Sequence, residues 1–295
     1  MLSIPEIAAQ LVNKSLSHPN EDYSRTIFFV GSKSVGKSTL LYSFLDKTDA
    51  VRETTVLEYS FGRKSMQKQS LDKIVCHIWE YGGKLEMLKN VLISIPKKGK
   101  TFFCIMVDLS KIKNIWNTLE TCIQSIAESC KDTPFEIIIL GGKYDIFKNY
   151  DSEIKKVICT TIRSVALIFG ANVIFYSSKD PQQLRKAKEM LHNIGFGNGI
   201  PLKDRHINIS KPIVIPKNTD TWESVGVPES NTEQVKMRHI SRIQPESGFS
   251  ESNKFVLQRT HPEPILDSLM SLKYQELRNL ELFEPSMDEY LSYMQ

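Results

Sequence analysis

Apolar residues in the first two thirds of the chain gather into short runs rich in β-branched and aromatic side chains. Runs that lack a polar residue at every second position are typical of strands buried on both faces of a sheet. We therefore predict strands at TIFFV (26–30), TTVLEYSF (54–61), KIVCHIWE (73–80), TFFCIMVDL (101–109), FEIIILGG (135–142) and NVIFYSS (172–178). The run at 135–142 is the clearest candidate for an interior strand.

Between these runs, apolar residues recur at the three- to four-residue spacing of amphipathic helices. The predicted helices are 4–16, 36–46, 85–94, 111–130, 151–169 and 180–193. Strands that alternate with helices pair in parallel through right-handed crossovers. The predicted fold is a three-layer α/β domain with a mostly parallel sheet, which occupies residues 1–200 together with the N-terminal helix.

The pattern changes near residue 195. Residues 201–262 are rich in Gly, Pro, Ser and Asn and lack sustained periodicity, so we predict an irregular extension or linker there, mobile over 229–254. The segment KPIVIP (211–216) could add one edge strand, because its prolines stand near the ends. Helical spacing returns over 263–295, either as a docking element or as a helix packed on its own domain. Its apolar stripe would consist of Ile265, Leu269, Leu272 and Leu280.

Charge and cysteine content exclude several classes of protein. The net charge of +4, with both signs mixed along 295 residues, is far below the basic density of a nucleic-acid-binding protein. The five cysteines form no C-x-x-C pair, which disfavours a disulfide framework and a zinc cluster. No apolar run approaches the ~18 residues of a membrane span, and the N-terminus lacks the pattern of a secretory signal. We expect an intracellular protein with no nucleic-acid partner and no membrane insertion.

The stretch GSKSVGKST (31–39) directly follows a predicted strand and opens a predicted helix. It has the full Gly-x-x-x-x-Gly-Lys-Ser spacing of a phosphate-binding loop, in which backbone N–H groups and a lysine face phosphate oxygens and a serine hydroxyl faces Mg²⁺. The alternative, a glycine turn with a chance Gly-Lys-Ser, is disfavoured by the correct flanking elements. The predicted nucleotide contacts are Gly31, Ser34, Val35, Gly36, Lys37, Ser38 and Thr39.

Two later loops occupy the places where Ras-like GTPases read guanine. GGKYDIF follows the strand at 135–142, and SSKD follows the last strand. Asp145 could accept from the guanine N1 and N2 hydrogens while Lys143 covers the ring, and Ser178 with Lys179 could face O6. Gly142 stands where Asn or Thr would connect the two loops, so we predict weak binding of guanine. A surface turn with a solvated Lys and Asp remains the alternative for GGKYDIF.

The hydrolytic positions depart from those of an active GTPase. The second switch should supply an aspartate for the Mg²⁺ shell and a glutamine that orients the attacking water. Here WEYGGK places Glu80 and Lys84 at these positions, and an ammonium group cannot accept a water hydrogen. The predicted Mg²⁺ shell is Ser38, Thr54 and Glu80, with Thr55 as the alternative to Thr54. We expect binding without appreciable hydrolysis; the alternative is a regulatory GTPase switch whose missing groups come from a partner in trans.

Several motifs together carry a family resemblance: EIAAQ, FFVGSKSVGKST, TTVLEYSFGR, HIWEYGGK, GGKYDIF and KVICTTIRSVALIFGANVIFYSSK. Over about residues 4–200, and again weakly in HPEPILDSLMSLKYQELRNLELF, the chain resembles the dynein light intermediate chain family, in particular its dynein 2 members. The pairing of LEYSFGR with WEYGG is far more specific than the phosphate loop alone. The chain departs from the family at Tyr81, where the pattern has Leu, and at Glu53, where it has Pro. The segment 131–134 also lacks a long insert found in some relatives.

The resemblance implies a non-catalytic motor subunit with a Ras-like P-loop fold. Such a subunit would bind and stabilise the dynein 2 heavy-chain tail, contact other dynein 2 subunits and intraflagellar transport trains, and reach microtubules only indirectly. It would work in retrograde transport and cilium assembly, and it would be found in the cytoplasm, the cytoskeleton and the cilium, including the axoneme and basal body. GTP or GDP with Mg²⁺ is the implied cofactor.

Overall fold

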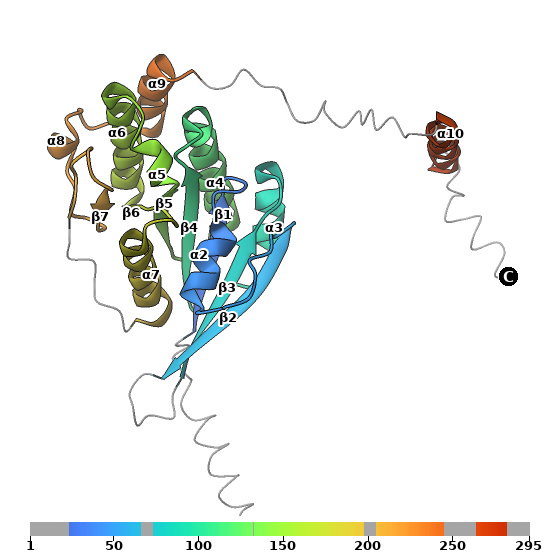
Figure 1. Cartoon of the computed structure of the whole chain (residues 1–295), viewed down its shortest axis with the longest axis horizontal. Coiled ribbons are helices and arrows are strands. Elements are labelled where there is room, and N and C mark those ends of the chain that lie inside the picture. Colours follow the sequence, from blue (N-terminus) through green and yellow to red (C-terminus); the bar gives the residue numbers. More distant parts are fainter. Residues whose placement is uncertain (1–23, 66–72, 132, 198–204, 245–263, 282–295) are drawn as a thin grey trace, which may run out of the picture. The chain divides into compact units, whose positions relative to one another are not determined.

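The computed structural model describes residues 24–65, 73–131, 133–197, 205–244 and 264–281 (Figure 1). The chain divides into two units, Met1–Glu246 and Ser247–Gln295, and the described part of the second is the helix α10 (Pro264–Glu281). The helix predicted at 4–16 lies outside the described residues.

A seven-stranded sheet, in the order β2-β3-β1-β4-β5-β6-β7, forms the centre of the first unit. Its pairs are parallel except at the two edges, where β2 runs antiparallel to β3 and β7 antiparallel to β6. The strands are β1 (Arg25–Gly31), β2 (Leu57–Ser65), β3 (Lys73–Tyr81), β4 (Lys100–Asp108), β5 (Phe135–Gly142), β6 (Asn172–Phe175) and β7 (Val214–Ile215). The predicted mostly parallel sheet is therefore confirmed, with β5 inside it.

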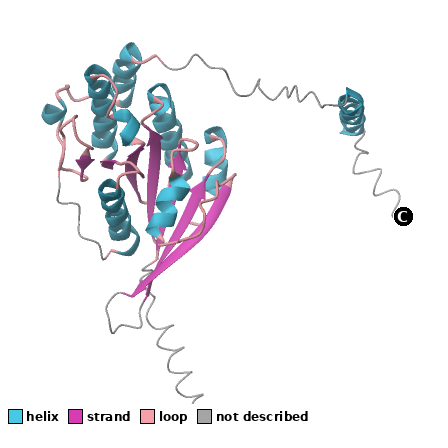
Figure 2. Cartoon of the chain, viewed as in Figure 1, coloured by secondary structure: helices cyan, strands magenta, loops and turns pink. Residues whose placement is uncertain are grey.

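Helices cover both faces of the sheet and make the three layers visible in Figure 2. One apolar core joins the sheet to α2 and α7, and the other joins it to α3, α4 and α6. The helices are α2 (Lys37–Phe44), α3 (Leu88–Ser94), α4 (Ile115–Ser129), α5 (Tyr144–Phe147), α6 (Ser152–Phe169), α7 (Pro181–Phe196), α8 (Trp222–Val225) and α9 (Thr232–Arg242). Short 3₁₀ turns at Leu85–Met87 and Ile112–Asn114 precede α3 and α4.

The helix α7 shows how local sequence sets these boundaries. The Asp180 side chain accepts hydrogen bonds from the backbone N–H groups of Gln182 and Gln183, and Pro181 occupies the first helical position. At the other end Gly197 takes a left-handed conformation, with φ of 68°, and ends the helix. The predicted helix at 180–193 therefore extends to Phe196.

The segment after 204 is more regular than the composition predicts. The edge strand expected at 211–216 is present as β7. The irregular extension predicted over 201–262 and the mobility predicted over 229–254 do not describe residues 232–242, which form α9. Asn231 and Gln234 make a capping box at its start, and its buried residues Val235 and His239 face the domain. A short polar helix of this kind is stabilised by packing rather than by its own periodicity, which explains why the pattern did not reveal it.

A buried ion pair fastens the same segment to α6. The Arg163 guanidinium donates from Nε to Asp220 Oδ2 and from Nη2 to Asp220 Oδ1, both at 2.8 Å. Arg205 donates to the same carboxylate at 3.0 Å. This geometry orients residues 205–226 along α6 and makes them part of the first unit.

All five cysteines are buried and free, as expected from their odd number and spacing. Burial raises the thiol pKa of Cys76, Cys122 and Cys159 to about 12, so these residues are apolar fillers of the core. In the described parts of the chain there is no helix with the length and apolar character needed to cross a bilayer.

Candidate nucleotide site

The phosphate loop lies between β1 and α2, where the sequence predicts it. Gly31 has φ of 123°, and a Cβ there would lie 2.1 Å from the carbonyl oxygen of Met106 on β4, so only glycine fits. Gly36 has φ of 99° and directly precedes α2. The Ser32 N–H donates to the Met106 carbonyl at 2.8 Å and fixes the start of the loop on β4. The loop therefore has the backbone shape that a phosphate cradle needs.

Lys37 points back into its own loop. It is 6% exposed, and its Nζ donates to the Ser32 carbonyl at 2.9 Å. Burial lowers the pKa of Lys37, while the Glu80 carboxylate opposes that shift. The ammonium group is thus held inside the phosphate loop by one backbone acceptor and one nearby negative charge.

Ser38, Glu80 and Thr54 come together at the start of α2. The Ser38 hydroxyl donates to Glu80 Oε1 at 2.6 Å. Burial raises the pKa of Glu80, which is 1% exposed, against the opposing effects of the Ser38 hydrogen bond and the Lys37 charge. Glu80 Oε2 is buried and has no hydrogen-bond partner among the described residues. An unpaired buried carboxylate oxygen beside a serine hydroxyl suits Mg²⁺, which prefers oxygen ligands.

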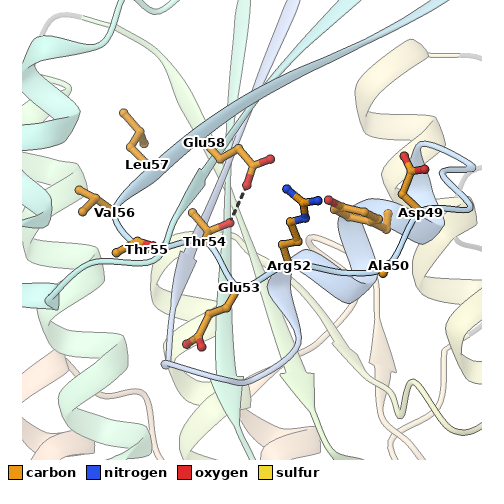
Figure 3. A pocket seen from close by; sticks show the side chains of 10 residues that line it. Asp49, Ala50, Arg52, Glu53, Thr54, Thr55, Val56, Leu57 and Glu58 are labelled. Carbon is orange, nitrogen blue, oxygen red and sulfur yellow. Dashed lines mark hydrogen bonds between the residues drawn. The ribbon is translucent and has the colours of Figure 1, made fainter.

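The segment around Thr54, which would form the first switch, lies near Glu80 but also contacts the neighbouring residue Glu58. The Thr54 hydroxyl donates to Glu58 Oε2 at 3.0 Å, as Figure 3 shows. The surrounding hollow, of about 770 Å³, is lined by Tyr42, Asp49, Ala50 and residues 52–58. Arg52 and Glu58 point toward the same space in this view. The Arg52 side chain is exposed to solvent.

The second switch is folded tightly against the first. A Cβ on Gly82 would lie 1.8 Å from the Thr54 carbonyl oxygen, and the Gly82 N–H donates to the Val56 carbonyl at 2.9 Å. This close crossing explains why β2 begins at Leu57 and not at the predicted residue 54. The Tyr81 hydroxyl donates to the Lys84 carbonyl at 2.5 Å. The residue in the water-orienting position is therefore held through its backbone by Tyr81.

The two loops predicted to read the base lie side by side at the carboxyl ends of β5 and β6. Asp145 Oδ1 accepts from the Ser177 hydroxyl at 2.8 Å, and Oδ2 lies 3.0 Å from Lys179 Nζ. Burial of Asp145 opposes its ionisation, but the hydrogen bonds from Lys179 and Ser177 outweigh this effect and lower its pKa. Ser178 is exposed beside them. The Lys179 pair is largely solvated, so a purine could compete for this carboxylate at small cost.

Lys143 is arranged differently from the prediction. Its backbone is left-handed, with φ of 61°, and its Nζ donates to Asp108 Oδ2 at 2.6 Å. Asp108, at the end of β4, also accepts from the backbone N–H and hydroxyl of Ser110. The Lys143 charge is therefore paired with β4, and at most its aliphatic stem is available to cover a base.

Comparison with known proteins shows to which family the chain belongs. Residues 26–145 match the family described as "Ras of Complex, Roc, domain of DAPkinase". The cytoplasmic dynein 2 light intermediate chain 1 of Danio rerio is 30% identical over 303 residues, covering 86% of this chain and 84% of that protein. The chain belongs to the cytoplasmic dynein 2 light intermediate chain family. The Homo sapiens protein of the same name is 28% identical over 324 residues, covering 96% of this chain and 89% of its own length.

Two further matches have lower sequence identity to this chain. The septum-promoting GTP-binding protein 1 of Schizosaccharomyces pombe is 26% identical over 157 residues, covering 53% of this chain and 76% of that protein. A solved structure described as the dynein light intermediate chain's conserved domain is 17% identical, covers 76% of this chain and 93% of that one, and has a TM-score of 0.44.

Two residues and one contact of this site were not predicted from the sequence. Asp108 pairs with Lys143, Ser177 holds Asp145, and Val35, itself a predicted phosphate-loop residue, also fills the space beside Gly142. Asp108 could have been noticed, because an acidic residue at the end of an otherwise apolar strand lies at the ligand-binding edge of a parallel sheet. The Val35–Gly142 contact gave no such signal, since the two residues are separated by more than a hundred residues of sequence.

Proposed function

We propose that this protein is a non-catalytic light intermediate chain of the cytoplasmic dynein 2 motor complex. In this role it binds and stabilises the heavy-chain tail for retrograde intraflagellar transport and cilium assembly, and it reaches microtubules only through the heavy chain. It would work in the cytoplasm and cilium, at the axoneme and basal body. The observation that carries this proposal is a family relation extending over most of both chains rather than over the Ras-like domain alone.

The phosphate loop is proposed to hold a guanine nucleotide as a structural ligand. Gly31, Ser34, Val35, Gly36, Lys37, Ser38 and Thr39 would surround the phosphates. Asp145, with Lys143, Ser178 and Lys179, would face the base. Mg²⁺ would be held by Ser38 and Glu80, with Thr54 beside them, and the unpaired Glu80 Oε2 supports this donor set. When bound, the ion neutralises phosphate charge. A ligand present at a thousand times its dissociation constant stabilises the fold by about 4 kcal/mol.

Hydrolysis is proposed to be negligible because Lys84 lacks an acceptor for a water hydrogen. Unaided small GTPases hydrolyse GTP at only about 10⁻⁴ s⁻¹ even with their glutamine present. The alternative is a switch completed by a partner in trans, which would add the missing groups at the exposed first-switch hollow.

Single-turnover hydrolysis of GTP, with and without the purified heavy-chain tail, separates the two functions. The subunit role predicts stable co-purification with the tail and no release of phosphate above the rate of the Lys37→Ala variant. A tail-stimulated rate that Lys37→Ala abolishes would instead favour the switch. Identification of the nucleotide released on denaturation tests the base assignment, and assembly of Ser38→Asn with the tail tests whether the nucleotide is needed for docking.

A further inference from the structure

The edge strand β2 has one long side that no other described strand pairs with. It covers the nine residues Leu57–Ser65, contains no proline, and among the described strands pairs only with β3. Because the Gly82 N–H donates to the carbonyl of Val56, which stands opposite Gly82 in the β2–β3 register, the even-numbered residues of β2 bond inward. The backbone groups of Tyr59, Phe61 and Arg63 therefore point outward. Natural proteins usually shorten or interrupt such an edge.

The side chains on one face of this edge form an exposed aromatic ladder. Tyr59 is 44% exposed and Phe61 is 51% exposed, with ring centroids 6.3 Å apart. The Arg63 guanidinium lies 5.1 Å from the Phe61 ring, and Trp79 on β3 lies 4.7 Å from the Tyr59 ring. Contiguous exposed apolar surface of this kind is typical of an interaction site.

The opposite face of the strand carries charge of both signs. Glu58 stands at the start of β2 and Lys64 near its end, with the small residues Ser60 and Gly62 between them. Lys64 lies over the Phe196 ring, with Nζ 5.8 Å from its centroid, on the α7 side of the sheet. An acidic start and a basic end make the strand complementary to an antiparallel copy of itself.

We propose that β2 pairs with β2 of a second copy of this chain, antiparallel and with Phe61 on the two-fold axis. In this register Glu58 stands opposite Lys64 of the other copy, twice over. Tyr59 stands opposite Arg63 of the other copy, and Phe61 opposite itself. The odd-numbered residues then form the hydrogen-bonded pairs, which is what their outward backbone groups require. The result is a closed isologous dimer with a sheet continuous across both copies.

Neighbouring registers match less well. Moving the axis to Ser60 places Glu58 opposite Gly62 and leaves both charges unpaired. Moving it to Gly62 places Lys64 opposite Ser60. A one-residue slip in the pairing would turn the aromatic face of one copy toward the charged face of the other. Cross-strand pairs of opposite charge or of aromatic residues are favourable, so the register centred on Phe61 is preferred.

Charge exchange tests the register. The full chain is expected to be a dimer at micromolar concentration by sedimentation equilibrium. Glu58→Lys or Lys64→Glu places two like-charged pairs across the axis and is expected to raise the dimer dissociation constant about tenfold or more. A mixture of the two single variants restores every opposite-charge pair in the heterodimer, as does the double exchange in one chain. A wild-type chain that stays monomeric, or an equal loss in the mixture, would overturn the proposal.

Cysteine cross-linking provides a second test, which does not depend on the charges of Glu58 and Lys64. Because all native cysteines are buried, Phe61→Cys adds the accessible thiol. Directly opposed residues in a hydrogen-bonded antiparallel pair have Cα atoms about 5.5 Å apart, within the range of a disulfide. Mild oxidation should link Phe61→Cys chains into covalent dimers. The matched control Tyr59→Cys should not link to itself, because it stands opposite Arg63, but it should link to Arg63→Cys. Equal linking of every variant would indicate non-specific collision and would contradict the register.

Discussion

The Tyr81 hydroxyl donates to the carbonyl of Lys84 at 2.5 Å, so residues 81–84 form a tight turn held by this hydrogen bond. A Cβ on Gly83 would lie 2.7 Å from Tyr81 Oη, so the tyrosine side chain packs directly against the glycine. Tyr81 is 3% exposed. The second switch is therefore fixed by a contact within the protein, which suits a persistent surface better than a segment that changes shape with nucleotide state.

Tyr81→Phe removes only this hydrogen bond. Because the ring remains, we expect a loss of about 1 kcal/mol in the free energy of unfolding, together with faster amide exchange at Gly82 and Gly83. Urea unfolding and hydrogen exchange measure the two effects. Tyr150→Phe is the matched control, since Tyr150 donates a similar bond, to Ser110 at 2.7 Å, outside the second switch. Unchanged exchange at Gly82 in Tyr81→Phe would show that the bond does not fix the loop.

Gly142 and Val35 explain why the usual asparagine of the base loop is absent. A Cβ on Gly142 would lie 2.9 Å from Val35 Cγ2 and 3.0 Å from the Val35 carbonyl oxygen. We therefore expect Gly142→Asn to destabilise the fold by about 1–3 kcal/mol rather than to improve guanine binding. Thermal unfolding and a fluorescent GDP analogue give the two readouts. Val35→Ala combined with Gly142→Asn should recover part of the stability; tighter binding by Gly142→Asn alone would contradict this explanation.

The sequence predicted the sheet, most helices and the phosphate loop because each depends on local pattern: apolar runs, helical spacing and the fixed positions of GSKSVGKST. It predicted the side-chain contacts made by the base and switch loops less well. The Lys143–Asp108 ion pair and the Val35–Gly142 contact join residues far apart in sequence, and nothing in the pattern of either segment reports the other. The helix α9 was missed for a related reason, since its buried face is formed by only a few residues whose partners lie on α6 and α4.

Glu80→Gln is predicted to change both the pH dependence of stability and the stabilisation by Mg²⁺. Burial holds the folded-state pKa of Glu80 above its ordinary value of 4.5, so the protonated form is favoured in the fold. Its contribution to stability is present below pH 4.5 and is lost as pH rises through the raised pKa. The stability difference between Glu80→Gln and wild type should therefore move in favour of the variant as pH increases from 4.5 toward neutral.

The same variant tests the proposed Mg²⁺ shell. Adding Mg²⁺ with GDP should raise the melting temperature of wild type more than that of Glu80→Gln, because the amide cannot replace the carboxylate charge. Glu58→Gln is the control, since Glu58 contacts Thr54 but not Ser38. An equal response to Mg²⁺ in all three proteins would remove Glu80 from the shell.

His239 joins α9 to α6 and is predicted to make this contact acid-sensitive. It is 1% exposed, and burial lowers its pKa from 6.5 to about 4. Thr161 Oγ1 donates to the Val157 carbonyl, so it accepts from His239 Nδ1 at 3.0 Å, and the buried Nε2 has no partner among the described residues. A charged imidazole is therefore disfavoured at this position.

Because the folded-state pKa lies below the unfolded value, the stability contributed by neutral His239 is present above pH 6.5. It is lost as pH falls toward 4, by up to about 3 kcal/mol. Urea unfolding of the full chain between pH 7 and 4 should show this slope in wild type. His239→Leu should flatten it, whereas His206→Leu, at an exposed histidine, should leave it unchanged. An unchanged slope in His239→Leu would assign the acid sensitivity to other groups, and a parallel loss of α9 amide protection in wild type would locate the opening at this helix.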